Sequence, residues 1–216
     1  MERRSARIAL CAALVLGLVS SAAFASDKTS KSTKADAKMP KEAPKADASH
    51  DAMMEMMTKY AMPGPMHELM KPMEGNWKTT AKSWLKPGSE PSVSEGTCES
   101  RWILGNRYLQ SSYKGQMQGS PFEGFGLMGY DNMKKEFVSV WADNMGTGLA
   151  MSDGTADPSG KVLTMTTMMN DPESGKMVPY KMVTKVMDEN QYTMSMVNMK
   201  DGTERTEMEI LYTRMK

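Results

Sequence analysis

Residues 204–215 read ERTEMEILYTRM, and their side chains alternate between two kinds. The even-numbered positions are mostly apolar, with Met208, Ile210, Tyr212 and Arg214. The odd-numbered positions between them include the polar Glu207, Glu209 and Thr213. Successive side chains of a β-strand point to opposite faces of a sheet. The stretch therefore predicts a strand whose first set of side chains faces the interior and whose second set faces solvent.

Two earlier segments repeat this alternation, with inward positions predicted at Tyr192, Met194 and Met196 and at Phe137, Ser139, Trp141 and Asp143. From Gly75 onward, Gly, Asp, Asn and Pro interrupt the pattern about every 8 to 12 residues, which is typical of an all-β meander. The pattern predicts ten strands, near residues 75–85, 91–103, 107–117, 121–130, 135–143, 147–156, 161–170, 177–187, 190–199 and 204–215.

The simplest arrangement for these strands is an up-and-down antiparallel β-barrel over residues 74–216, because closure removes exposed sheet edges. An open or flattened sheet packed under helices is the alternative. In a barrel the first and last strands pair, and the charged Arg214 on an inward face needs a partner. Trp77 in the first strand can supply an indole face for its guanidinium, so we expect this pair at the closure.

The N-terminal 25 residues have the pattern of a secretory signal peptide. Arg3, Arg4 and Arg7 precede an apolar run at residues 10–19, and residues 23–25 (AFA) form a small-x-small cleavage site. The run is shorter than the roughly 20 residues that span a bilayer. We therefore expect export to the periplasm or secretion, with no stable membrane anchor.

Residues 26–50 lack aromatic residues and also Val, Ile and Leu, so this stretch is predicted to be a disordered tether. Residues 51–73 are rich in methionine and predict two short helices. Asp51 is expected to cap the first helix, and Pro65 to begin a second that ends before Pro72.

Charge and cysteine content narrow the function classes. The formal net charge is +1 and becomes −1 without residues 1–25, which gives no reason to expect nucleic acid as a partner. Cys98 is then the remaining cysteine of the exported chain. With no histidine near it in sequence, it is expected to be a buried, unreactive thiol.

Longer motifs resemble the family called domain of unknown function 1579. They lie at residues 63–67 (PGPMH), 75–77 (GNW), 99–109 (ESRWILGNRYL), 121–124 (PFEG), 129–132 (GYDN), 141–145 (WADNM) and 212–214 (YTR). The Gly-x-Trp at residues 75–77, together with Arg214, also resembles the closure of lipocalins and the wider calycin superfamily. The resemblance implies a β-barrel-like domain and no established reaction. Met66 departs from the family pattern, which has an acidic residue before the histidine.

The predicted barrel lumen is the first candidate binding site. Its expected lining is apolar and aromatic with one carboxylate: Trp77, Trp141, Asp143, Tyr192, Met194, Met196, Met208, Ile210 and Tyr212. Flexible methionines suit an adaptable pocket for a small apolar or amphipathic molecule. The alternative is that these side chains simply fill a closed core. Asp143 is expected to be a hydrogen-bonded structural carboxylate and not a catalytic one.

The second candidate site uses methionine, which accounts for 26 of the 216 residues. A thioether is a soft ligand that favours Cu(I). Met53, Met54, Met56, Met57 and His67 are the candidate ligands, with His50 and with Met62, Met66, Met70 and Met73 close in sequence. The alternative is that these methionines form the apolar sides of short helices packed on the barrel.

We find no Ser-His-Asp order, zinc spacing or phosphate loop in this sequence. The sequence therefore predicts an exported, non-catalytic binding protein with a small-molecule ligand in the barrel. A Cu(I)-binding protein that needs no other cofactor is one alternative. A structural module that uses the helical segment to contact a protein partner is the other.

Overall fold

The computed structural model describes residues 46–117, 119–171 and 175–216. The predicted signal peptide and residues 26–45 of the predicted tether lie outside the described residues. Among the described helices, none is long and apolar enough to cross a membrane.

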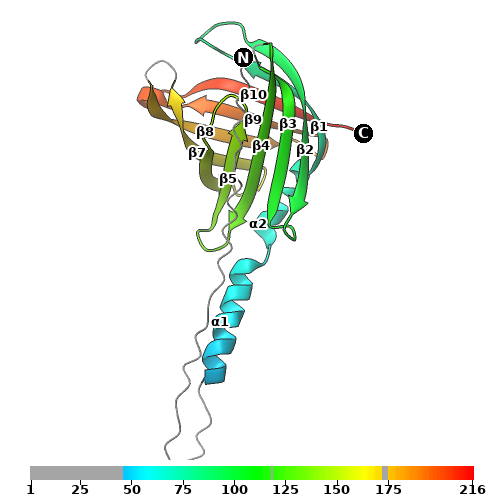
Figure 1. Cartoon of the computed structure of the whole chain (residues 1–216), viewed down its shortest axis with the longest axis vertical. Coiled ribbons are helices and arrows are strands. Elements are labelled where there is room, and N and C mark those ends of the chain that lie inside the picture. Colours follow the sequence, from blue (N-terminus) through cyan, green and yellow to red (C-terminus); the bar gives the residue numbers. More distant parts are fainter. Residues whose placement is uncertain (1–45, 118, 172–174) are drawn as a thin grey trace, which may run out of the picture. The chain divides into compact units, whose positions relative to one another are not determined.

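Ten antiparallel strands form a closed barrel in which each strand pairs with its neighbours in sequence (Figure 1). They are β1 (Gly75–Ser83), β2 (Ser92–Ile103), β3 (Tyr108–Met117), β4 (Ser120–Asp131), β5 (Glu136–Asp143), β6 (Ala150–Ala156), β7 (Val162–Asp171), β8 (Lys176–Val186), β9 (Gln191–Asn198) and β10 (Arg205–Arg214). The predicted all-β, up-and-down barrel of about ten strands is confirmed, and the open-sheet alternative is wrong.

Strands β1 and β10 close the barrel, and Trp77 and Arg214 are direct partners in their register. The Arg214 guanidinium carbon lies 4.2 Å from the centre of the Trp77 ring. Arg214 also donates hydrogen bonds from Nη1 to the Glu74 carbonyl at 2.7 Å and from Nη2 to the Pro72 carbonyl at 3.0 Å. Its Nε donates to the carbonyl of Glu189 at 2.6 Å. The predicted closure pair is confirmed, and it also holds the chain that enters β1.

Inward and outward positions alternate as predicted along most of β10, where Ile210 and Tyr212 are buried. Glu207 is the exception. The register between β9 and β10 shifts between Thr206 and Met208, so Glu207 is an additional, bulged residue. Its carboxylate accepts a hydrogen bond from the buried Asn198 at 3.0 Å, so the predicted solvent-facing position of Glu207 is wrong.

The methionine-rich segment forms helix α1 (Ala46–Ala61), a single turn α2 (Pro65–Glu68) and a 3-10 turn η1 (Lys71–Met73). The first helix begins five residues earlier than predicted, which makes the end of the predicted tether helical and rules out Asp51 as its cap. The predicted second helix is wrong in form, since it divides into α2 and η1 and Pro72 lies within η1.

The α2–η1 segment covers one end of the barrel, where Figure 1 shows α2 below the sheet. Met70 and Met73 are 0% and 3% exposed and belong to the core. The Trp77 indole Nε1 donates to the carbonyl of Met73 at 3.0 Å. For these two methionines the predicted alternative, packing on the barrel, is therefore correct.

Two barrel turns bind the C-terminal end of α1, whose last carbonyls have no partner within the helix. The Arg107 Nε donates to the carbonyl of Ala61 at 2.8 Å. The Asn132 amide donates to the carbonyls of Tyr60 at 3.0 Å and Met62 at 2.9 Å. These side chains supply the helix end with the hydrogen bonds that its own backbone cannot.

We expect Arg214→Met to lower the free energy of unfolding by about 2–4 kcal/mol, because the two part-buried carbonyls of Glu74 and Pro72 lose their donor. Urea titration followed by tryptophan fluorescence measures this change. Arg101→Met is the matched control, since Arg101 is an exposed partner of Glu99, and it should cost less than about 0.5 kcal/mol. Equal stabilities of the two variants would contradict the role of Arg214 in closure.

Candidate functional site

The inner face of the barrel carries many small side chains. Small residues occupy inward positions on eight of the strands: Thr79, Ala81, Gly96, Cys98, Ser100, Ser111, Gly124, Gly126, Ser139, Ser152, Gly154, Ala156, Thr167 and Thr184. Barrel diameter grows with strand number, and about eight strands already leave an interior that side chains just fill. Ten strands lined with small residues therefore leave space that large side chains would otherwise occupy.

The interior is divided along the barrel axis. At the α2 end, inward side chains such as Trp77, Phe137 and Leu163 are at most 2% exposed. Farther along the same face, several inward side chains are only half-buried: Met128, Ser139, Trp141, Met182, Met194, Met196 and Met208. Solvent therefore reaches these side chains, although Phe122, Val178 and Tyr180 on the same part of the inner face are buried. We refer to these seven residues as the accessible inner face.

Trp141 lies flat against the barrel wall. A Cβ added at Gly124 would overlap the indole ring, and one at Gly126 would lie 3.1 Å from it, so these glycines make room for the ring. The Trp141 Nε1 donates to Asp143 Oδ2 at 2.9 Å. Because the ring lies along β4, a large side chain contributes to the lining without crossing the lumen.

Asp143 fixes this arrangement. Its second oxygen, Oδ1, accepts a hydrogen bond from the backbone of Met145 at 3.0 Å. Both carboxylate oxygens are thus engaged in orienting Trp141 and the turn that follows β5. The geometry supports the structural reading of Asp143.

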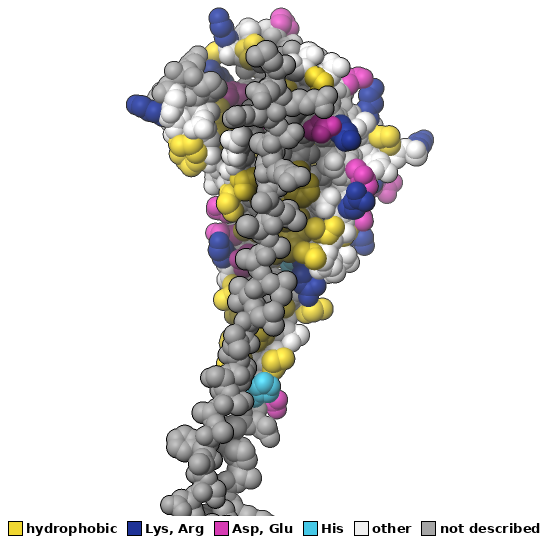
Figure 2. Space-filling view, viewed as in Figure 1, with side chains coloured by type: hydrophobic (Ala, Val, Ile, Leu, Met, Phe, Trp, Pro, Cys, Tyr) yellow, Lys and Arg dark blue, Asp and Glu magenta, His cyan; other side chains and the backbone are white. Residues whose placement is uncertain are grey.

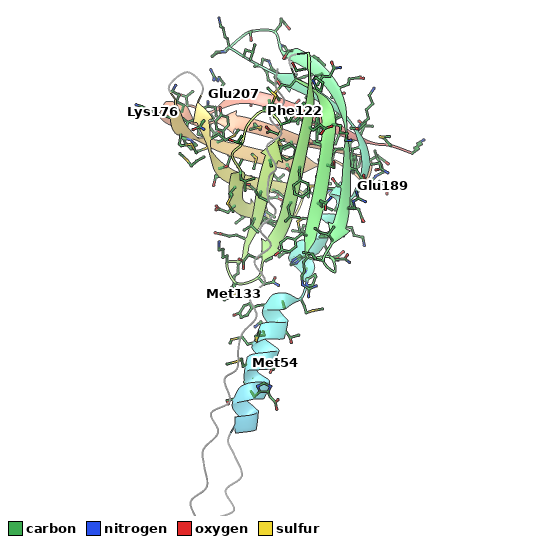
Figure 3. All side chains as sticks on the ribbon, viewed as in Figure 1. Met54, Phe122, Met133, Lys176, Glu189 and Glu207 are labelled. Atoms are coloured by element: carbon green, nitrogen blue, oxygen red, sulfur yellow. The ribbon has the colours of Figure 1, made fainter. Side chains whose placement is uncertain are left out.

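A polar cluster lies at the end of the barrel opposite α2, where Figure 3 labels Glu207. The Tyr180 hydroxyl donates to Glu207 Oε2 at 2.6 Å, and Arg205 pairs with the same carboxylate. Asn198 donates to both Glu207 and Tyr180. Burial alone raises the pKa of Glu207, but the bonds from Tyr180, Arg205 and Asn198 outweigh it and hold the pKa below its usual range.

Sequence reasoning missed this cluster because the bulge at Glu207 changes which face its side chain occupies. Tyr180 and Asn198 do fall at inward positions of β8 and β9, where they pair across the ladder. Alternation could have placed those two residues, but nothing local in the sequence marks the extra residue in β10.

The predicted lining residues differ in how far they are exposed to the space inside the barrel. Met194, Met196, Met208 and Trp141 belong to the accessible inner face. Tyr192 and Tyr212 are 6% and 8% exposed and stack with ring centres 4.1 Å apart. Trp77 and Ile210 belong to the packed core, and Trp77 is not exposed at all. The structure therefore places Trp77 in the closure and not in the lining that a ligand could reach.

The predicted metal ligands lie in two different environments. Met53, Met54, Met56 and Met57 are 49–58% exposed on α1, and Figure 2 shows hydrophobic side chains exposed along this helix. His67, in contrast, is 4% exposed on α2.

His67 already has structural partners. Its Nδ1 accepts a hydrogen bond from the Gly64 backbone at 3.1 Å, and its ring packs edge-on against Tyr130. Burial, and secondarily the Arg107 charge, lowers the pKa of His67. These contacts assign His67 to the packing of α2 on the barrel. Among the described residues, its hydrogen bond and ring contact go to Gly64 and Tyr130 and not to the four methionines of α1.

Other candidate metal, nucleophile and pocket sites in the described part of the chain give weaker support for a function. It contains no group of three or more His, Cys, Asp or Glu side chains that could hold a metal ion. Cys98 is 5% exposed, and burial raises the pKa of its thiol. Two surface depressions, of about 390 and 370 Å³, lie beside Glu95–Thr97 and around Trp102, separate from the accessible inner face.

Comparison with one known structure supports the fold. The chain is similar to Rv2717c from M. tuberculosis, known from a crystal structure, with a TM-score of 0.52 and 15% identity. The match covers 72% of this chain and all of that one. A redesigned β-barrel, b11L5F_LGL, is matched with a TM-score of 0.35 and 14% identity, over 70% of this chain and 96% of that one.

No curated protein matches this sequence. The family described as "Protein of unknown function (DUF1579)" matches residues 62–214. This range contains α2, η1 and all ten strands, so the resemblance expected from the sequence motifs is confirmed. The chain belongs to the DUF1579 family.

Proposed function

We propose that this protein is an exported, non-catalytic binding protein that holds a small apolar or amphipathic molecule in its barrel. The observation that carries the proposal is the accessible inner face. The core is packed at the α2 end of the barrel, but these side chains remain within reach of solvent. A ligand that binds there would bury the apolar surface that they still expose.

The chemistry of this face suits an adaptable site. Met182, Met194, Met196 and Met208 come from three adjacent strands, β8, β9 and β10. Unbranched thioether side chains adjust to irregular apolar shapes and contact aromatic rings favourably. Each 100 Å² of apolar surface that a ligand and this face bury together contributes roughly 2.5 kcal/mol before the costs of association.

The two ends of the barrel define a direction for entry. Met70, Met73 and Trp77 are buried at the α2 end, so a ligand would have to displace the core to pass there. The opposite end carries the polar Glu207 cluster. A ligand with an apolar body and a polar end can therefore enter from the opposite end while its body contacts the methionines.

The pattern of residues 1–25 supports export, and the expected chemistry of Cys98 is compatible with it. A lone, buried thiol requires no reducing environment for its protection. Transport or storage of a poorly soluble molecule outside the cytoplasm is the role that this combination supports best.

A fluorescence titration tests the lumen site. We expect the protein to bind N-phenylnaphthylamine, a neutral apolar dye that brightens in apolar surroundings. Met196→Glu should weaken this binding by at least about tenfold, because a charge on the inner face loses its hydration when the dye is bound. Met151→Glu on the outer face of β6 is the matched control, since Met151 is 71% exposed, and it should bind as the original protein does.

Two results would count against the proposal. One is the absence of dye binding by the original protein, and the other is equal loss of binding in both variants. Native mass spectrometry of protein purified from its own host supplies an independent measurement. A mass excess that disappears on denaturation is the expected result.

We further propose Cu(I) binding on α1 as a second function, favoured by where this helix begins. Since α1 begins at Ala46, His50 lies inside it. His50, Met53, Met54 and Met57 then occupy positions i, i+3, i+4 and i+7, which share one helix face. All four side chains are exposed, and Met56 lies on another side of the helix. An imidazole and three thioethers are a ligand set that Cu(I) favours.

Competition against a Cu(I) chelator tests this face. We expect Met53→Leu and Met57→Leu, made together, to lower the affinity for Cu(I) by at least about tenfold, because two of the soft ligands are lost. Met56→Leu is the matched control and should leave the affinity unchanged. If Met56→Leu weakened binding as much as the double variant, the methionines would be acting without a defined face.

A further inference from the structure

Two stacked tyrosines lie where the packed part of the interior meets the accessible inner face. Tyr192 of β9 and Tyr212 of β10 are direct partners in the register, and their rings are parallel within 11°. The Trp77 ring packs edge-on against Tyr192, with ring centres 4.8 Å apart. Along the same inner face, the next positions are Met194 on β9 and Ile210 on β10.

The hydroxyl groups of this pair lack protein partners. Tyr192 and Tyr212 are more than nine-tenths buried, yet neither hydroxyl makes a hydrogen bond to any residue that the structure describes. Other inner-face tyrosines do: the Tyr113 hydroxyl accepts from Thr79 at 3.2 Å, and the Tyr180 hydroxyl donates to Glu207. The pair is therefore not explained by the internal hydrogen bonding of the barrel.

Both hydroxyls border space inside the barrel that protein atoms do not fill. Across the described residues, every fully buried side-chain nitrogen or oxygen has a hydrogen-bond partner. A hydroxyl without such a partner is consequently not sealed inside packed protein. Since Tyr192 and Tyr212 occupy inward positions, the space that their hydroxyls reach lies inside the barrel.

These hydroxyls are hydrogen-bond donors over the physiological pH range. Burial raises the pKa of Tyr192 well above its usual value, and the neighbouring Tyr212 raises it further. Burial likewise raises the pKa of Tyr212. Each phenol therefore keeps its proton and can offer it to an acceptor.

The surroundings favour a neutral acceptor over an ionised one. The inner-face neighbours Thr79, Met194 and Ile210 carry no charge. The three guanidinium nitrogens of Arg214 each donate a hydrogen bond to a backbone carbonyl at the closure. A carboxylate or phosphate at this depth would be desolvated, and the nearest cation, Arg214, is already hydrogen-bonded to three backbone carbonyls, so burying such an anion is costly.

We infer that Tyr192 and Tyr212 hydrogen-bond the carbonyl oxygen of a neutral ligand, whose apolar body lies along the accessible inner face. The inference rests on the proposed lumen site and names the ligand class, a neutral carbonyl compound such as a ketone, quinone or amide. The ligand's carbonyl points toward the α2 end, and the methionines contact the rest of the molecule.

Prodan, a neutral naphthyl ketone, is the probe, because its emission moves to longer wavelength when its carbonyl accepts a hydrogen bond. We expect Tyr192→Phe and Tyr212→Phe each to weaken prodan binding by about 2- to 10-fold, and the double variant by more. The emission of bound prodan should move to shorter wavelength in parallel. Tyr108→Phe, on the outer face of β3, is the matched control and should change neither quantity.

N-phenylnaphthylamine, which has no carbonyl group, separates this inference from the proposed function. We expect the Phe variants to bind it as the original protein does. If prodan binding and emission are unchanged in the double variant, or if both dyes lose affinity together, the hydroxyl assignment is wrong and the lumen site stands. If the original protein binds N-phenylnaphthylamine but not prodan, the hydroxyl assignment is likewise wrong and the lumen site stands. Failure of the original protein to bind either dye would overturn the proposed function itself.

Discussion

The fold depends on the contact between the first and last strands of the barrel. Arg214 lies over Trp77, and it also donates hydrogen bonds to the carbonyls of Pro72 and Glu74 in the chain that precedes β1. One side chain thus closes the sheet and holds η1 against the end of the barrel. Without this closure, β1 and β10 would present unpaired edges and the core residues Met70 and Met73 would lose the surface on which they pack.

Closure with ten strands produces an interior with two parts. Large side chains such as Phe137 and Leu163 fill the α2 end, whereas glycine, serine and threonine line much of the remaining wall. The arrangement of Trp141 against Gly124 and Gly126 shows how a large ring can be accommodated without closing the lumen. The packed part stabilises the fold, and the accessible inner face is the site that we propose for binding.

Several elements were predictable because their cause is local. Alternation along β5, β9 and β10 follows from strand geometry, and turn residues mark the ends of all ten strands. Glu207 was placed on the wrong face because a bulge depends on how β10 pairs with β9, which one strand's pattern does not report. The start of α1 at Ala46 was missed for a related reason, since residues 46–50 (ADASH) carry no apolar periodicity that would distinguish a helix from a tether.

The sequence by itself determined the strand order, the inward parity of the lining and the pairing of Trp77 with Arg214, because period-two alternation and closure leave few alternatives. Tertiary structure decided which inward residues are available to a ligand. Trp77 and Tyr192 face inward, as Met194 and Met196 do. The packed pair differs from the accessible pair in its distance from α2 and η1. It likewise separated His67 from the methionines of α1, because burial and hydrogen bonding depend on neighbours that are distant along the chain.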